Sequence, residues 1–489
     1  MKKIIVCLYS ILCSVSISVA QDEIITITLS DAIMIATSIN PAIEAARYAE
    51  NIAWRNRKAT MGLRMPQVSV SGNFTHLGKD VAIDANHLKK PLQSAASDLI
   101  GVGIQNNLLS PQAASLLRDA IQPLTATDWS LTLQKQNIGI IGGEITIPVY
   151  TGGKINAANR IARIEEQIAA QTTTQVGNAV LSEVVSRYFG LALASQAIEV
   201  RQSVVDGIKR HLENAIMLEQ NGMIPRSERL YVEYKMAQAE RELQDVKLQH
   251  QTLMSALSST LADGTHQYNP TTTMFVVDSI ENVEYFKQVA TISNPLLNMI
   301  ALQRQVADEG VKVERADYLP QIAIAGAGSL YDYQLSNVLP RWAIGVGINI
   351  KIFDGLSREN RYAASKERVK YAERLEQDAH SDIAALIESL YNELQNCYNR
   401  ITSLQSSITF AEEYLHDIDI AFKEGVAAAT DVIDAELNLS KARIERIEAA
   451  YTYDVTLAQL LEAAGISEHY LDYCNSADTR QIKFDTKKQ

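Results

Sequence analysis

The chain is poor in cysteine, proline and tryptophan, and the shortage of cysteine excludes one class of fold. Its 489 residues include 4 Cys, 11 Pro and 3 Trp. Cys7 and Cys13 lie near the start of the chain, so too few cysteines follow for a small disulfide-stapled scaffold. Cys397 and Cys474 could pair in an oxidising compartment or remain as free thiols, and the sequence leaves both readings open.

Positive charge and catalytic motifs are scarce as well. The formal net charge is −12, with no basic stripe to meet phosphates, which excludes a nucleic-acid partner. The 8 histidines show no HExxH pattern or zinc-ligand spacing, and no GxSxG elbow occurs. The run "TGGKI" at 151–155 lacks the first glycine and the Ser/Thr of a phosphate loop. We therefore expect neither an enzyme nor a bound cofactor or metal.

A long apolar run occurs at the start of the chain, and no comparable run follows. Lys2 and Lys3 precede apolar residues 4–17, and Ser18-Val19-Ala20 offers a small-x-Ala cleavage site. This pattern is typical of a secretory signal peptide, predicted here over residues 1–20. No later run reaches the eighteen or so apolar residues that a spanning helix needs. We therefore expect an exported protein that is either soluble or held in a membrane by β-strands.

The rest of the sequence is duplicated. Asn-Pro at 40–41 recurs at 294–295, and Pro-Gln at 66–67 recurs at 320–321, both 254 residues on. Later matches are 203 residues apart and relate "PVYTGGK" at 148–154 to "KIFDGLS" at 351–357 and Gly222 to Gly425. The first spacing, 254 residues, is longer than the second, 203 residues, and this difference indicates an insert in the first half, within about 78–135. Each half is predicted to run helix, strand, loop, strand, long helix, turn, long helix.

Two proline-free stretches predict very long helices. Residues 154–220 and 357–422 contain no proline, and in the first of them apolar residues recur every three or four positions. At 1.5 Å per residue, each would be a helix of roughly 100 Å, longer than a globular domain needs. Each stretch ends near a glycine, where the chain is predicted to turn back into a second amphipathic helix. We therefore expect two long coiled-coil hairpins.

The predicted strands have two different faces. The segments 65–75 and 343–353 alternate between apolar side chains and polar or small ones. A strand of a membrane barrel shows this alternation, and so does a half-buried strand of a soluble sheet. The apolar face contains Val68, Val70, Ile344, Val346, Ile348 and Ile350, and the opposite face of the second segment contains Gly345, Gly347 and Asn349.

Together these features resemble the TolC-like outer-membrane efflux proteins over about residues 30–465. The sharpest local match is "GVAAATDVIDAELNL" at 425–439, which is similar to the second periplasmic tip of that family. The resemblance implies a mainly α fold with a membrane β-barrel. Each chain would give four strands to a twelve-stranded barrel closed by a homotrimer, and the long helices would continue it as an α-helical tunnel.

The resemblance also implies a division of the chain and a function. Residues 21–282 would form the first repeat with a tip near 222, residues 283–465 the second with a tip near 425, and 466–489 a tail. The protein would be the passive exit duct of a tripartite efflux or type I secretion system. It would lie in outer-membrane lipid, extend into the periplasm, and work with a periplasmic adaptor (membrane fusion protein) and an inner-membrane transporter.

Site residues follow residue by residue from this resemblance. Asp431 and Asp434, with Glu228 of the first half, would set selectivity at the tunnel entrance, although solvated first-turn acids show the same pattern. Gly222 and Gly425 would mark the adaptor-contacting tips, or serve simply as turn glycines. Phe422 and Ala427 stand where the family has an aromatic hydroxyl and an arginine, so its entrance latch is not expected here.

Two questions remain open at the level of sequence. The insert at 78–135 is expected on the extracellular side, as a lid, a plug or an ordinary surface loop. The competing reading of the whole chain is a periplasmic coiled-coil scaffold without a channel, in which the strands form a soluble sheet.

Overall fold

A computed structural model describes residues 24–263 and 266–482, so the predicted signal peptide lies outside the described residues. The described chain is mainly helical and divides into two compact units. The helical unit contains the residues up to Asn56, Ile161–Asp308 and the residues from Glu367 on. The sheet unit contains Arg57–Arg160 and Glu309–Lys366. Each unit therefore takes residues from both halves of the duplication.

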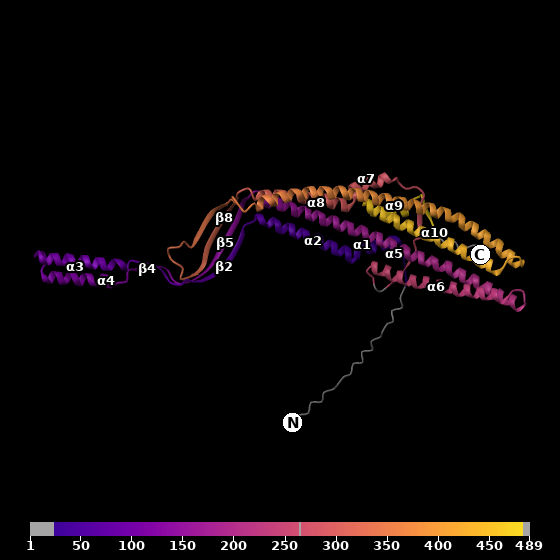
Figure 1. The fold of residues 1–489 in the computed structure, drawn as a ribbon, viewed down its shortest axis with the longest axis horizontal. Coiled ribbons are helices and arrows are strands. Elements are labelled where there is room, and N and C mark those ends of the chain that lie inside the picture. The colour runs from indigo at the N-terminus through magenta and orange to yellow at the C-terminus, as the bar shows by residue number, and fades with distance from the viewer. Residues whose placement is uncertain (1–23, 264–265, 483–489) are drawn as a thin grey trace, which may run out of the picture. The chain divides into compact units, whose positions relative to one another are not determined.

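The sheet unit contains the four strands that the alternating patterns predicted. They form one antiparallel sheet in the order β2-β5-β8-β9, so each half of the duplication supplies two neighbouring strands. Figure 1 labels β2, β5 and β8 of this sheet. Among the described strands, β2 and β9 each pair on one side alone, which leaves both edges of the sheet open. The strand bounds are β2 (Gln67–His76), β5 (Asn137–Thr151), β8 (Gln321–Tyr333) and β9 (Trp342–Asn349).

The last strand is shorter than predicted. We expected a strand to residue 353 with Ile350 on its apolar face, but β9 ends at Asn349 and Ile350 lies beyond it. The partner strand explains the difference, because Asn349 pairs with Gln321, the first residue of β8. Pro320, which precedes β8, has no backbone N–H to extend the ladder. The assignment of Ile350 to the strand was therefore wrong.

The insert folds as a helical hairpin on a short ribbon (Figure 1). Ser110 caps the second helix by accepting a hydrogen bond of 3.2 Å from the Ala113 N–H, and Pro111 occupies its first turn. The Leu109 side chain packs over Gly103 of the first helix. The insert's elements are β3 (Val81–Asp84), η2 (Asn86–Leu88), α3 (Lys89–Gln105), α4 (Pro111–Ala126) and β4 (Ser130–Gln134).

The two long helices are confirmed. Helix α5 (Lys154–Gln220) begins and ends at the predicted residues, and α9 (Ser357–Lys423) runs one residue further than predicted. Each turns back into a shorter helix, α6 (Arg226–Thr260) after α5 and α10 (Ala429–Ala464) after α9. The other helices are α1 (Leu29–Ile39), α2 (Pro41–Met61), η1 (Gly62–Arg64), α7 (Val283–Ser293), α8 (Pro295–Ala316), η3 (Ser467–His469) and α11 (Tyr470–Cys474).

The repeated Asn-Pro has the same structural role in both halves. The Asn40 amide donates to the Thr260 carbonyl at 3.2 Å and accepts from the Ala42 N–H at 2.9 Å. In the second half, Asn294 donates to the Ala463 carbonyl at 2.7 Å and accepts from the Leu297 N–H at 3.0 Å. Each asparagine thus starts one helix and satisfies a carbonyl near the end of another. The proline that follows occupies the first turn, where no donor is required.

The sequence did not reveal six short strands. Two of them, β3 and β4, belong to the insert, and the other four form two-stranded sheets in the helical unit. These four strands of the helical unit are only three or four residues long, which is too short for an alternating pattern to identify them. Their bounds are β1 (Ile24–Ile27), β6 (Gln267–Pro270), β7 (Phe275–Val277) and β10 (Thr479–Gln481).

The core of the helical unit encloses a carboxyl group. Asp454 is fully buried and accepts a 3.3 Å hydrogen bond from the Phe275 N–H. Burial raises the pKa of Asp454 well above its ordinary value, because it disfavours the charged form of the carboxyl group. Cys397 and Cys474 are free thiols, and burial raises the pKa of Cys397 to about 12, so it has little thiolate at neutral pH.

The two halves end their last helices in the same left-handed conformation with different residues. Gly465 has φ +78°, and Ala262, 203 residues earlier, has φ +53°. A Cβ at Gly465 would collide with the Ser293 carbonyl. We expect Gly465→Ala to lower the free energy of unfolding by about 2 kcal/mol or more, and Ala262→Gly to raise it by roughly 0.5–1 kcal/mol. Thermal unfolding followed by circular dichroism compares both with the parent protein, and equal effects of the same sign would contradict this account.

Candidate functional site

The four-stranded sheet has one apolar face and one face of small and polar residues. Ile145 of β5 lies opposite Val68 on one side and Gly326 on the other, and Gly326 lies opposite Ile344. Directly paired residues point to the same side of a sheet, so this register aligns the apolar positions of separate strands. The structure therefore places five of the six predicted apolar residues on one face: Val68, Val70, Ile344, Val346 and Ile348.

The apolar face is exposed in the single chain. Val68 and Ile344 are each 73% accessible, and Trp342, at the end of β9, is 70% accessible. Exposed apolar surface on this scale marks a face that meets lipid or another protein. Soluble sheets bury such a face, so the competing reading of a soluble scaffold leaves this surface unexplained.

The opposite face is lined by short side chains around one carboxylate. The next register row contains Ser69, Glu144, Ala327 and Ala343. The three residues predicted for this face, Gly345, Gly347 and Asn349, follow Ala343 at alternate positions of β9 and share its side of the sheet. A Cβ added at Gly345 would meet open space, so the small residues leave room in front of the face. The Glu144 carboxylate accepts a weak 3.4 Å hydrogen bond from Thr146.

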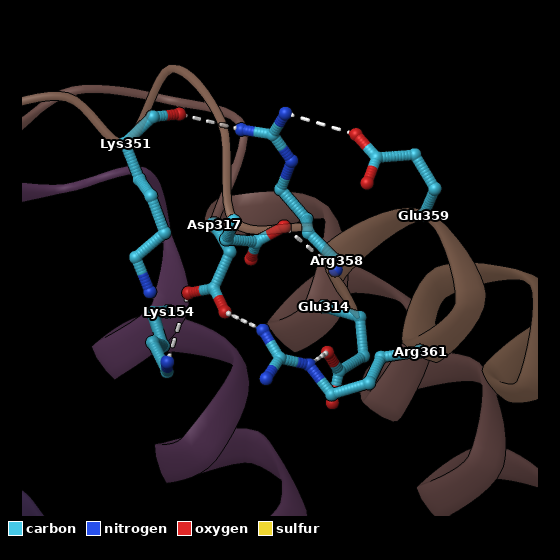
Figure 2. A network of polar contacts seen from close by, with 8 residues as sticks. Lys154, Glu314, Asp317, Lys351, Arg358, Glu359 and Arg361 are labelled. Atoms are coloured by element: carbon cyan, nitrogen blue, oxygen red, sulfur yellow. Dashed lines mark hydrogen bonds and ion pairs between the residues drawn. The ribbon is translucent and has the colours of Figure 1, made fainter. Parts of the chain in front are cut away.

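The strand-to-helix junctions of the two halves are joined by a polar network (Figure 2). Asp317, just after α8, accepts hydrogen bonds from Lys154 of α5 at 2.9 Å and from Arg361 of α9 at 3.2 Å. Arg358 donates to the Lys351 carbonyl at 2.7 Å and to Glu359 at 3.0 Å (Figure 2). Asp317 thus connects Lys154, at the start of α5, to Arg361, near the start of α9.

Both hairpin tips use their glycine as a helix terminator. Gly222 and Gly425 have φ of +69° and +77°, and the next residue of each tip donates back five residues, from Met223 to Leu218 at 2.9 Å and from Val426 to Ala421 at 2.8 Å. The turn reading of the two glycines is therefore confirmed. Their role in adaptor contact stays a prediction, but Met223 and Val426 are 71% and 81% accessible, which gives each tip an exposed apolar residue.

The two hairpins pack against each other near their tips, within the helical unit. Ile208 of α5, Val232 of α6 and Ile433 of α10 are fully buried in a shared cluster. Phe422, at a position where the family has a latch residue, packs edge-on to the His211 ring with centroids 6.1 Å apart. This ring contact joins α5 to α9.

The two predicted entrance acids have different surroundings. Asp431 accepts a 3.1 Å hydrogen bond from the Ala428 N–H and so caps the start of α10. Asp434 is 3.3 Å from the Lys235 ammonium and 3.5 Å from the Tyr231 hydroxyl, both on α6. Glu228 lies in the first turn of α6. Both aspartates are exposed on one face of α10, but the charge of Asp434 is partly compensated within the chain.

The sequence reasoning missed Lys235 as the partner of Asp434. Burial alone would lower the pKa of Lys235, but its contacts with Tyr231 and Asp434 outweigh this and raise it, so the side chain stays charged. The cation also lies 5.2 Å from the centre of the Tyr231 ring. The duplication offered a sign that α6 and α10 meet here, because Tyr231 and Asp434, which are in contact, occupy equivalent positions 203 residues apart.

A buried acid behind the entrance residues also escaped the sequence reasoning. Glu436 lies against Gly207 of α5, where its carboxylate fills the space that a Cβ would need. Burial raises the pKa of Glu436 to about 7. The nearest ring nitrogen, His211 Nε2, is 3.8 Å from this carboxylate, and burial lowers the pKa of His211. A glycine inside a long helix was the available sign of a close approach.

Two kinds of feature are absent from the described part of the chain. Within 24–263 and 266–482, no helix combines the length and the apolar character needed to cross a membrane. In the same part of the chain, no three His, Cys, Asp or Glu side chains are grouped so that they could hold a metal ion.

Known proteins share this fold and part of this sequence. Residues 287–466 match the family model described as outer membrane efflux protein. The chain is 22% identical to the cobalt-zinc-cadmium resistance protein CzcC of Cupriavidus metallidurans, over 65% of this chain and 76% of that protein. The chain thus resembles the TolC-like outer-membrane efflux proteins. The family match accordingly assigns it to the outer membrane, with a periplasmic extension.

Two further comparisons extend this likeness along the chain. The outer membrane protein TolC of Escherichia coli is 20% identical, over 65% of this chain and 67% of that protein. The outer membrane channel CmeC of Campylobacter jejuni has the same fold, with a TM-score of 0.69 at 13% identity, covering 91% of this chain and 89% of that one. The predicted mainly α fold, with long helices and a strand region, is confirmed.

Proposed function

We propose that the protein is the outer-membrane exit duct of a tripartite efflux or type I secretion system and that it works as a homotrimer. The observation that carries the proposal is the four-stranded sheet, which has two open edges and one exposed apolar face. Unpaired backbone groups cannot face lipid, so such a sheet enters a membrane only when its edges are paired. Pairing β9 of each chain with β2 of the next would close twelve strands without a remaining edge.

The two faces of the sheet then receive distinct roles. Val68, Val70, Ile344, Val346 and Ile348 would face lipid, whereas Gly345, Gly347 and Asn349 would line the lumen beside Glu144. Short side chains on the lumen side keep the passage wide, and the cargo passes without covalent chemistry. Small molecules and proteins are both compatible with such a duct.

The periplasmic end of the proposed duct would be formed by the hairpin tips. Asp431, Asp434 and Glu228 would set the charge of the entrance, and Gly222 and Gly425 would present Met223 and Val426 to a periplasmic adaptor. Exposed apolar residues at the centre of a small convex tip suit insertion into a partner's groove. An inner-membrane transporter would supply energy through that adaptor.

The test is the assembly state and conductance of the purified protein. We expect a heat-labile trimer that resists extraction from the outer membrane by carbonate and conducts ions in planar bilayers. A periplasmic scaffold would be released by the carbonate wash. A monodisperse monomer that keeps its sheet in mild detergent would refute the proposal.

A further inference from the structure

The α3–α4 hairpin presents an apolar surface that nothing in the single chain covers. Ile100 and Gly103 of α3 and Ala114 of α4 are buried between the two helices. Other apolar side chains remain exposed beside this seam. Five of them are Leu92 (48% accessible), Leu99 (72%) and Val102 (54%) on α3, and Leu117 (42%) and Leu124 (57%) on α4, whereas Leu116 of α4 (70%) is exposed on another side of its helix.

Five of the exposed apolar residues form one face. Successive residues of a helix are about 100° apart, so Leu92, Leu99 and Val102 form a stripe on one side of the buried residues of α3. By the same count, Leu117 and Leu124 lie on the corresponding side of Ala114 in α4. Because the two helices run in opposite directions, both stripes open to the same side of the hairpin. We call these five residues the insert face.

The composition of the hairpin favours packing against other helices over contact with lipid. Residues 89–126 contain no Trp, Tyr or Phe, whereas segments that lie on a membrane surface carry aromatics on their apolar face and Lys or Arg opposite. The basic residues here are Lys89, Lys90 and Arg118, and they are offset by Asp98 and Asp119. Leu, Val, Ala and Gly are the residues that bring helices close together.

The place of the hairpin in the chain identifies its partner. The insert connects β2 to β5, and β2 is one of the open edges of the sheet. In the proposed trimer, on which this inference rests, each β2 pairs with the neighbouring chain, so three inserts leave the barrel around one axis at the same level. We infer that the insert faces of the three copies pack against one another and form a helical cover over the exit of the duct.

Cysteine cross-linking of the assembled protein tests this contact. Leu99→Cys and Leu117→Cys lie on the insert face, and Ser94→Cys, on the exposed polar side of α3, is the matched control. After mild oxidation of intact cells, we expect most of each insert-face variant to migrate as covalently linked chains in a denaturing gel. Ser94→Cys and the parent, which retains Cys397 and Cys474, should migrate as single chains.

Separate readouts distinguish failure of the inference from failure of the proposed function. A heat-labile trimer in which neither insert-face variant cross-links would overturn the inference and leave the duct proposal standing, whereas loss of the trimer in the parent would remove both. A bimane label on Leu99→Cys provides a second measurement. A blue shift that appears in phosphatidylethanolamine liposomes but not in detergent would place the insert face on lipid and overturn the inference.

Discussion

Val346→Lys is expected to prevent stable assembly in the outer membrane, whereas Gly345→Lys, one residue earlier in β9, is expected to leave assembly nearly unchanged. The two positions lie on opposite faces of the same strand, and both have open space in front of them. A lysine facing lipid near the midplane costs roughly 2–4 kcal/mol per chain, and a trimer carries that cost three times. A lysine facing a water-filled lumen remains hydrated and costs little.

The measurement is the amount of heat-labile trimer in the outer-membrane fraction, relative to total protein in the same cells. Equal total expression of both variants serves as the control for synthesis and export. If Val346→Lys assembles and Gly345→Lys does not, the assignment of lipid and lumen faces is reversed. If both assemble equally well, the sheet does not span a membrane.

The cation preference of the entrance is expected to change in opposite directions when one or the other partner of an ion pair is replaced. Asp434→Asn leaves Lys235 unopposed and should lower cation preference, whereas Lys235→Met leaves Asp434 unopposed and should raise it. A unit charge about 4 Å from a hydrated ion is worth about 1 kcal/mol, which corresponds to roughly a fivefold change in relative permeability. The double variant removes both charges and should return close to the parent protein.

Reversal potentials of single channels in planar bilayers under a salt gradient measure this preference. Glu228→Gln, in the first turn of α6, serves as a comparison and should have a smaller effect. Asp431→Asn should lower cation preference as well, at a cost of about 0.5–2 kcal/mol in stability, because Asp431 also caps α10. Unchanged selectivity in all four single variants would return these residues to a purely structural role.

Much of the architecture could be predicted because the features that decide it are local. Proline-free amphipathic runs predicted α5 and α9 to within one residue, and period-two alternation identified four strands and their two faces. The Asn-Pro and Pro-Gln matches located equivalent helix starts and ends in the two halves. Positive-φ glycines at 222 and 425 mark both turns, as their position after long helices suggested. Each of these signals depends on residues only a few positions apart.

The remaining features depend on contacts between segments distant in sequence. The buried Asp454, the charged Lys235 and the buried Glu436 were not predictable, because each owes its state to a partner element, which is β7, α10 or α5 in turn. The end of β9 at Asn349 is set by Pro320 across the ladder, and the short strands are too brief to show a pattern.

By itself, the sequence determined that this chain is duplicated and largely helical, that its strands have two different faces, and that it lacks the motifs of an enzyme. Periodicity and residue spacing reveal these features because they reflect local backbone preference directly. Tertiary structure alone decided which residues pair across the duplication. The insert is a case in point. Its apolar residues are spaced as in any amphipathic helix, and only the antiparallel pairing of α3 and α4 turns two separate stripes into one exposed face. The physical reason is that charge compensation, burial and surface continuity are properties of neighbours in space, which the order of residues along the chain does not record.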